Sequence, residues 1–279
     1  MKKLNYILVL ICIINYLDWC TIIPYFDYSG KKIFYQCNEN HSQNAIIFIH
    51  GAGGNSNIWK DQLKLKINYN LYALDLPSHN KSDNISELSL DIYINAIKNL
   101  INYIGAEEII LCGHSLGGAI IQEFYFKYPN DVSALILCGT GSRLRVDPHI
   151  LTQIKSNYQG YLNDLQTGAF YTKTPKEIKL KSIEETTKTT PEVTYIDFEI
   201  CDNFDTLDKT SSIEVPCLIV CGKHDKLTPL KYSKFFYDNI NNSNLVIIKK
   251  AGHMVMIEQP KKLNKAIENF IKNNLKKNN

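Results

Sequence analysis

Ser115 is the residue whose setting most clearly suggests chemistry. It is the centre of a Gly-His-Ser-Leu-Gly pentapeptide at positions 113–117, which follows the apolar run Ile109–Cys112 and precedes the helix-like stretch 118–127. A strand, then Gly-x-Ser-x-Gly, then a helix is typical of a nucleophile elbow, a sharp turn that exposes the serine hydroxyl. The glycines permit this turn because larger side chains would collide with neighbouring backbone. The pattern therefore predicts a serine nucleophile, and the helix N-terminus behind it favours negative charge.

A serine hydroxyl is a weak nucleophile and needs a general base, held in place by a third group. Among the seven histidines, His253 is the best candidate, because it lies in a Gly-His-Met turn after the last apolar run and before the closing helix. His50 also ends an apolar run, but its neighbours are the glycines of a loop with another use. His114 adjoins Ser115, and its side chain should point away from the serine side chain.

Asp225 is the predicted acid that orients the base. It follows the apolar run that precedes the one leading to His253, so the two side chains are expected at neighbouring strand ends. Asp147 is a weaker candidate, after the preceding strand. Asp75 lies on the far side of the strand that leads to Ser115, and we expect it to cap or brace a loop.

An oxyanion intermediate requires two preorganised backbone N–H donors. Leu116, directly after the nucleophile, is one predicted donor, and Ala52 in the glycine-rich segment 50–54 is the other. Beyond these donors, we expect a substrate pocket with aromatic and apolar walls. Its predicted lining residues are Gly51, His114, Tyr158, Tyr161, Phe170 and Met254.

The elements that position these residues alternate along the chain. A predicted hairpin at 25–37 is followed by apolar runs that resemble buried strands, and helical periodicity separates several of them. Those runs lie at 45–49, 70–74, 108–112, 134–138, 217–221 and 245–249, and the clearest helical stretches lie at 90–104 and 258–274. This alternation predicts an α/β fold with a mostly parallel central sheet and helices on both faces. Each polar motif follows such a run, and ligands of parallel sheets bind at the carboxyl ends of the strands.

The pattern changes between about residues 141 and 207, where strand signals stop and helix-like segments at 148–166 and 175–188 begin. We therefore expect a helical cap at 144–204, inserted into a core formed by 24–143 and 205–279. Apolar side chains of the cap serve either the pocket or the packing of cap on core, and the pattern leaves both roles open.

Residues 1–23 form an apolar N-terminal extension. A short basic start and the apolar stretch 4–14 resemble a signal peptide, but no small-x-small cleavage site follows and the stretch is short for a membrane-spanning helix. A signal or anchor and a dispensable, non-targeting extension both remain open. The sequence favours a cytoplasmic location, with export or anchoring through residues 1–20 as the alternative, and contact with a membrane is expected only if that segment anchors the chain.

Composition excludes several classes of function. The chain has 279 residues and a net charge of +3, and no basic patch with interleaved aromatics suggests nucleic acid as a partner. Its eight cysteines form no Cys-x-x-Cys pair and no Cys/His cluster with zinc spacing. Buried, reduced thiols are the expected state, which suits a reducing compartment. Neither a metal nor an organic cofactor is implied.

Together, the motifs resemble those of the α/β-hydrolase superfamily, in its single-chain branch with a helical cap. The resemblance extends from about Pro24 to Leu275. Its motifs are His-Gly-Ala-Gly-Gly at 50–54 with Trp59, Asp-Leu-Pro-Ser-His at 75–79, Gly-His-Ser-Leu-Gly-Gly at 113–118, Gly-Lys-His-Asp at 222–225 with Pro229, and Gly-His at 252–253 with Glu258 and Pro260. The resemblance implies the α/β-hydrolase fold and a triad in the chain order Ser115, Asp225, His253.

Departures from family patterns narrow the expected activity. Serine at 115 argues against haloalkane dehalogenases and epoxide hydrolases, which use a carboxylate nucleophile. Ala119 stands where the menaquinone-pathway lyases carry arginine, which argues against that activity. The segment 77–82 lacks two glycines that the superfamily commonly has there, but its role is structural.

The expected function is that of a carboxylesterase that cleaves a small acyl ester through an acyl-enzyme. Hydrolysis of a C–C bond, a thioester or an amide on the same triad is the alternative. His114 favours an esterase, because many C–C hydrolases carry asparagine before the nucleophile. From a different class of function, a ligand sensor with slow turnover also remains open.

Overall fold

The computed structural model describes residues 24–275. Its centre is an eight-stranded sheet with the order β1-β2-β4-β3-β5-β6-β7-β8. The first two pairings, β1 with β2 and β2 with β4, are antiparallel, and all the others are parallel. The strands are β1 (Tyr25–Tyr28), β2 (Lys31–Asn38), β3 (Asn44–Ile49), β4 (Asn70–Leu74), β5 (Glu108–His114), β6 (Ala134–Cys138), β7 (Cys217–Gly222) and β8 (Ser243–Ile248). The prediction of a mostly parallel sheet is confirmed.

The central strands form where the chain is continuously apolar. All residues of β6 are buried, as are residues 45–49 of β3, as expected for parallel strands covered on both faces. Within β3, Ile47 and Ile49 contribute to the hydrophobic core on one face, while Ile46 and Phe48 contribute to the core on the other. This alternation follows from the two-residue period of a strand.

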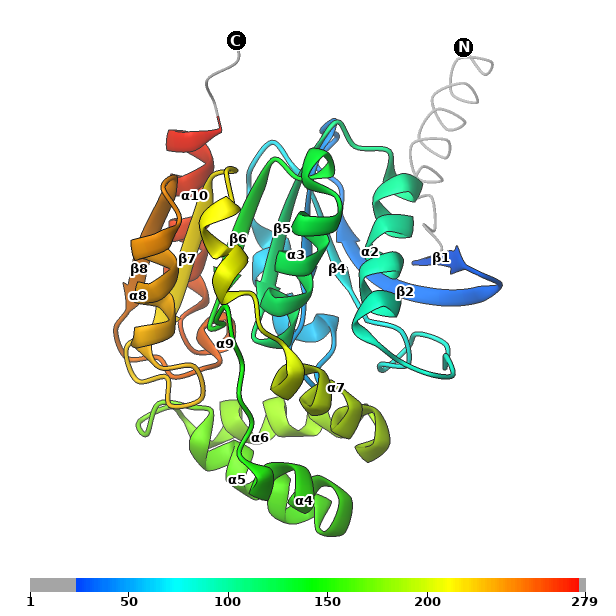
Figure 1. Ribbon diagram of the computed structural model, residues 1–279, viewed down its shortest axis with the longest axis vertical. Coiled ribbons are helices and arrows are strands. Elements are labelled where there is room, and N and C mark those ends of the chain that lie inside the picture. Colours follow the sequence, from blue (N-terminus) through cyan, green and yellow to red (C-terminus); the bar gives the residue numbers. More distant parts are fainter. Residues whose placement is uncertain (1–23, 276–279) are drawn as a thin grey trace, which may run out of the picture.

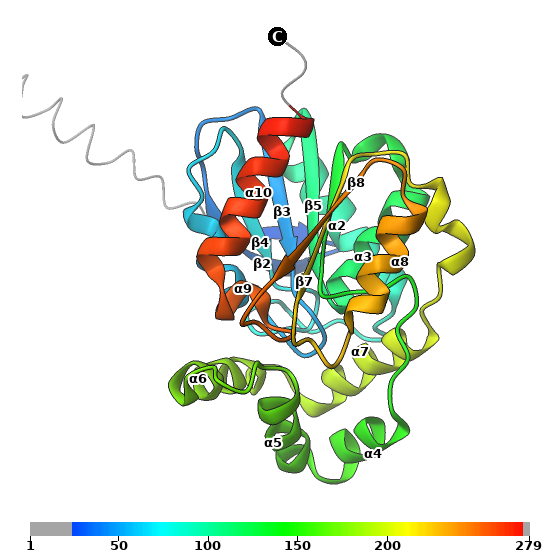
Figure 2. The same cartoon turned by 90° about the vertical axis from the view of Figure 1, so that its left-hand side faces the viewer.

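Helices cover both faces of the sheet. Figures 1 and 2 show α2, α3 and α8 on one face and α9 and α10 on the other. The helices of the core are α2 (Leu90–Ile104), α3 (Leu116–Lys127), α8 (Leu230–Asn239), α9 (Val255–Glu258) and α10 (Pro260–Asn274), with the short 3-10 helices η1 (Ser56–Trp59), η2 (Gln62–Lys64), η3 (Pro129–Asp131) and η4 (Leu207–Ser212). Phe124 and Tyr93 anchor the first face, and Trp59 and Phe270 anchor the second.

Four α-helices lie between β6 and β7, and Figures 1 and 2 show them below the carboxyl ends of the strands. They are α4 (Pro148–Ser156), α5 (Tyr158–Gly168), α6 (Lys176–Thr186) and α7 (Pro191–Asn203), called the cap helices below. The predicted helical stretch 148–166 is divided at Asn157, whose side chain accepts a hydrogen bond from the Gly160 N–H and so starts α5. Ile154, Tyr161 and Leu162 form a small core within the cap helices.

The predicted N-terminal extension, 1–23, with its alternative roles as signal, anchor or dispensable segment, lies outside the described residues. Within 24–275, no helix combines the length and the apolar character that crossing a membrane requires.

Candidate active site

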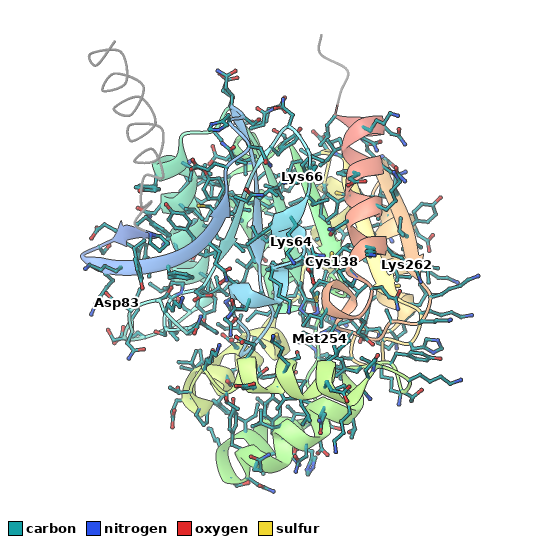
Figure 3. All side chains as sticks on the ribbon, turned by 180° about the vertical axis from the view of Figure 1, so that it is seen from behind. Lys64, Lys66, Asp83, Cys138, Met254 and Lys262 are labelled. Atoms are coloured by element: carbon teal, nitrogen blue, oxygen red, sulfur yellow. The ribbon has the colours of Figure 1, made fainter. Side chains whose placement is uncertain are left out.

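Ser115 occupies the turn between β5 and α3 with an unusual backbone conformation. Its φ is 53° and its ψ is −117°, a combination that costs free energy for a residue with a side chain. The Ser115 N–H donates to the carbonyl of Cys138 at 3.1 Å, and the Thr140 hydroxyl donates to the Ser115 carbonyl at 2.8 Å. Cys138, labelled in Figure 3, ends the adjacent strand β6. Contacts from the neighbouring strand end therefore hold the strained turn.

Two glycines make this turn sterically feasible. A Cβ atom on Gly113 would lie 2.3 Å from the Gly117 carbonyl oxygen, and one on Gly117 would lie 2.4 Å from the Ile49 carbonyl oxygen. Both distances are far below van der Waals contact. The close approach of β3, β5 and α3 thus requires glycine at both positions, which agrees with the sequence argument for the elbow.

Asp225 and His253 follow β7 and β8, and their side chains are in contact. His253 Nδ1 donates to Asp225 Oδ2 at 2.9 Å, and both residues are buried. The other carboxylate oxygen accepts the N–H groups of Leu227 and Thr228, each at 2.9 Å. The bond to Asp225 fixes the imidazole tautomer with its proton on Nδ1, so Nε2 is left as the basic nitrogen.

The surroundings of Asp225 keep its carboxylate ionised. Burial alone would raise the pKa of Asp225, but the charge and hydrogen bond of His253, together with hydrogen bonds from Thr228, outweigh burial and lower it. An ionised carboxylate stabilises the imidazolium that forms when His253 accepts a proton.

His114 braces the His253 loop. Its Nε2–H donates to the His253 carbonyl at 3.1 Å, and the two rings lie 4.5 Å apart. Burial, with the neighbouring His253, lowers the pKa of His114 well below its usual value. His114 is therefore neutral and supports the loop that carries His253.

Ser115 and His253 share one cavity of about 450 Å³, which lies between the strand ends and the cap helices. Of the predicted pocket residues, five line it: Gly51, His114, Tyr161, Phe170 and Met254. Met254 is labelled in Figure 3, at the level where the core meets the cap helices. Within the described residues, no hydrogen bond joins the Ser115 hydroxyl to the His253 ring, although both side chains face the same space.

Tyr158 is the exception among the predicted pocket residues, because the structure places it outside the cavity wall. Its ring packs 5.5 Å from that of Tyr161, and its hydroxyl lies 3.3 Å from Thr194 Oγ1. Tyr158 therefore packs within the cap helices. Tyr158 lies only one helical turn from Tyr161 on α5, but the two rings have different neighbours.

Several cavity residues are not singled out by the sequence. They are apolar side chains of the cap helices and of the segment leading into them: Leu144, Val146, Leu165, Ile183 and Phe198. The sequence pattern offers no signal for them, because apolar helix residues recur with the same periodicity whether they pack in a core or line a pocket. Their presence makes the cavity wall largely apolar.

The predicted oxyanion donors, Leu116 and Ala52, belong to segments next to Ser115. Leu116 is the first residue of α3, and the first N–H groups of a helix lack intrahelical partners. Ala52 lines the cavity, and a Cβ atom on its neighbour Gly51 would lie 3.1 Å from Ser115 Cβ. The loop at 50–54 therefore passes directly beside the serine.

His50 holds that loop and lies outside the cavity wall. Its Nδ1–H donates to the Gly51 carbonyl at 2.8 Å, and its Nε2 accepts the Leu76 N–H at 3.1 Å. Burial, with the adjacent His79, lowers the pKa of His50 to about 3. A neutral His50 is thus a fixed brace for the loop at 50–54.

The alternative acids have other hydrogen-bond partners. Asp75 accepts hydrogen bonds from the Ser56 N–H at 2.7 Å and the Asn80 amide at 2.8 Å, so it braces two loops as expected. Asp147 caps α4 by accepting the His149 N–H at 2.9 Å. Asp225 is the acid that the structure brings to His253.

Comparisons with known proteins agree with this architecture. A family model described as serine aminopeptidase, S33, matches residues 40–260. A solved structure described as a thermophilic esterase is 35% identical in sequence and superimposes with a TM-score of 0.78, covering 89% of this chain and 96% of that chain. That structure therefore resembles this chain in both sequence and fold.

Two sequence relatives differ in how much they share. An uncharacterized protein of Mycobacterium tuberculosis (strain ATCC 25618 / H37Rv) is 35% identical over 99 residues, which cover 35% of this chain and only 29% of that protein's length. The pimeloyl-[acyl-carrier protein] methyl ester esterase of Wigglesworthia glossinidia brevipalpis is 25% identical over 260 residues, covering 87% of this chain and 98% of that protein.

Proposed function

The chain belongs to the serine aminopeptidase S33 family of α/β-hydrolases, and from that premise we propose that it is a serine carboxylesterase. One observation carries the proposal: the strained Ser115 and His253, whose ring is bonded to the buried Asp225, face a single, largely apolar cavity. A nucleophile, a base and an orienting acid are the groups that acyl transfer needs. Two similar proteins, described as a thermophilic esterase and a methyl ester esterase, support an ester as substrate.

In the first half of the reaction, Ser115 Oγ attacks the acyl carbon while its proton passes to His253 Nε2. The carbonyl oxygen becomes an oxyanion and accepts the N–H groups of Ala52 and Leu116. The ester C–O bond then breaks, and His253 returns its proton to the leaving alkoxide. Asp225 stabilises the imidazolium throughout, and an acyl-Ser115 ester remains.

Water completes the cycle. His253 Nε2 takes a proton from the water molecule, whose oxygen attacks the acyl carbon, and a second oxyanion forms in the same place. Collapse of this intermediate breaks the bond to Ser115 Oγ, which regains its proton from His253. The products are a carboxylic acid and free enzyme, so atoms and charges balance.

The cavity supports a substrate with a substantial apolar part. Its volume of about 450 Å³ is within the usual range for small-ligand sites, and Ile183, Phe198 and Phe170 contribute apolar walls. We propose a neutral ester whose hydrocarbon portion lies under the cap helices.

Amide hydrolysis is a second candidate, because the family description names an aminopeptidase and acidic residues line the cavity. Asp147 and Asp164 are in the wall on the side of the cap helices. A carboxylate there suits a substrate amino group. Relative turnover of amino-acid anilides and matched esters distinguishes the two candidates.

Ser115→Ala tests the nucleophile. We expect wild-type enzyme to hydrolyse p-nitrophenyl esters and to be labelled at Ser115 by a fluorophosphonate, as located by peptide mass spectrometry. The variant should lose label and at least ~10³-fold in kcat, since removing a triad nucleophile leaves only residual catalysis. Wild-type turnover in Ser115→Ala on the whole acyl panel would overturn the assignment.

A further inference from the structure

Asp197 on α7 is a buried carboxylate that joins the cap helices to the core. Its Oδ2 accepts the Gly53 N–H at 2.8 Å and His79 Nε2–H at 2.9 Å. Its Oδ1 accepts the Tyr93 hydroxyl at 2.6 Å. The Asp197 and His79 side chains are both 0% exposed. Three donors from three separate segments of the core therefore meet one carboxylate of the cap.

The hydrogen-bond partners of His79 indicate that its ring is positively charged. His79 Nδ1 faces the Pro77 carbonyl at 2.9 Å, and Nε2 faces Asp197. Both partners are acceptors, so both ring nitrogens carry protons and the ring is an imidazolium. Burial alone would lower the pKa of His79, but the charge and hydrogen bond of Asp197 outweigh it and raise the pKa. Asp197 and His79 thus form a buried ion pair.

The hydrogen bond to Gly53 connects Asp197 to the loop that carries a proposed oxyanion donor. Gly53 follows Ala52, the proposed oxyanion donor, and has a φ of +62°. A Cβ atom on Gly53 would lie 2.9 Å from Thr194 Oγ1, so α7 also packs closely against this residue. Helix α7 therefore determines both the position and the hydrogen bonding of the peptide that follows Ala52.

We propose that Asp197 is a positioning residue for the oxyanion hole, acting through Gly53 to hold the Ala52 N–H toward the reacting carbonyl. This inference rests on the proposed esterase function. Apolar packing would attach α7 to the core without the desolvation cost of a buried ion pair. A carboxylate fixes the direction of one particular N–H group, which apolar contact does not.

The test compares Asp197→Asn with a matched control on the same helix, Asp202→Asn. Asp202 accepts the Val146 N–H at 3.0 Å and has no bond to the loop at 50–54. With p-nitrophenyl butyrate, we expect Asp197→Asn to lower kcat by ~10-fold to 100-fold with KM within threefold, because a misplaced donor weakens transition-state binding alone. The Asp202→Asn control should stay within threefold in both constants.

A transition-state analogue provides the second readout. A trifluoromethyl ketone forms an oxyanion adduct with the serine, so its affinity should fall in Asp197→Asn by the same factor as kcat/KM. The affinity for butyrate, the product acid, should stay within threefold. Equal losses in the two aspartate variants, or unchanged affinity for the ketone, would show that Asp197 only attaches the cap helices.

Hydrogen exchange of the wild-type protein keeps the inference testable if Asp197→Asn does not fold. The Gly53 amide should exchange slowly, at a rate close to that of interior α7 amides, since the bond to Asp197 protects it. Fast exchange of Gly53 would overturn the inference. Failure of the proposed function has a separate signature, namely a wild-type protein that is neither active nor labelled at Ser115.

Discussion

Buried histidines near the cavity differ in charge because their hydrogen-bond partners differ. His50 bonds one donor and one acceptor, so it stays neutral, and its pKa falls to about 3. His79, whose ring lies 4.8 Å away, bonds two acceptors and is charged. The identity of each partner, more than burial, therefore decides which ring holds an extra proton.

The raised pKa of His79 predicts a dependence of stability on pH. In the folded state the pKa lies above the usual 6.5, so the ion pair stabilises the fold fully below about pH 6.5, and this contribution is lost as pH rises through the folded-state pKa. The free energy of unfolding of wild type minus that of His79→Gln should therefore shrink as pH rises above about 6.5. Urea denaturation at a series of pH values measures the difference.

His50 and His114 act in the opposite direction, since their lowered pKa values make protonation favour the unfolded state as pH falls below 6.5. The effect of His114 cancels in the difference, because His79 does not contribute to its pKa shift. The effect of His50 does not cancel fully, since His79 helps to lower its pKa, but this residue acts only as pH falls below about 6.5. A difference that does not change with pH would show that His79 is neutral in the folded protein.

At the scale of elements, β3, β5 and α3 approach so closely that the turn around Ser115 depends on glycine. Gly113 and Gly117 each face a backbone carbonyl at a distance that excludes a side chain. The helix that begins at Leu116 therefore starts directly against the sheet. Strain at the serine is sustained because several elements hold the turn at once.

Gly113→Ala should destabilise the fold by about 3 kcal/mol, because the added Cβ would meet the Gly117 carbonyl and nothing flexible can move aside. Gly168→Ala is the matched control: a Cβ there meets nothing within 4 Å, and Gly168 ends helix α5. Chemical denaturation of both variants measures the change. Equal stability of the two would contradict the close packing of β5 against α3.

A second carboxylate, Glu258, connects the loop that carries His253 with the segment after α5. Glu258 at the end of α9 accepts the Gly252 N–H at 2.7 Å and the Tyr171 N–H at 2.8 Å. In addition, the His253 N–H donates to the Ala169 carbonyl at 2.7 Å. The loop that carries His253 and the segment after α5 are thus bonded to each other.

At the scale of the whole molecule, the chain has the α/β-hydrolase fold, and hydrogen bonds join its cap helices to the core at several places. Asp197 bonds the loop at 50–54, and Glu258 bonds the segment after α5. Figure 2 shows the cap helices below the strand ends, and side chains of these helices line the cavity. We expect the cap helices to limit the size of the substrate.

Ile183→Trp tests that role. Ile183 on α6 lines the cavity, so a larger side chain should reduce its volume and shift the preferred acyl chain to shorter lengths. We expect kcat/KM for the longest good substrate to fall roughly 10-fold, since pockets discriminate by about that factor per methylene. Leu180→Trp, on the exposed side of the same helix, is the control. A p-nitrophenyl ester series from acetate to decanoate measures both, and an unchanged preference would mean that the acyl chain lies elsewhere.

Much of this architecture was predictable from the sequence because local patterns encode it. Continuous apolar runs indicated each central strand within about two residues of its observed bounds, and Gly-x-Ser-x-Gly indicated the turn at Ser115. The pairing of Asp225 with His253 was predictable as well, since neighbouring parallel strands end at the same edge. The catalytic roles assigned to these residues remain predictions.

Only the tertiary structure decided the contacts between the cap helices and the loops near the start of the chain. Asp197 and Gly53 are 144 positions apart, and no local pattern distinguishes a buried aspartate in an amphipathic helix from an exposed one. Likewise, only the positions of the cap helices show that Tyr158 packs within the cap and that Tyr161 lines the cavity. Strands and turns depend on neighbours in sequence, whereas the charge and contacts of a buried side chain depend on partners that folding brings together.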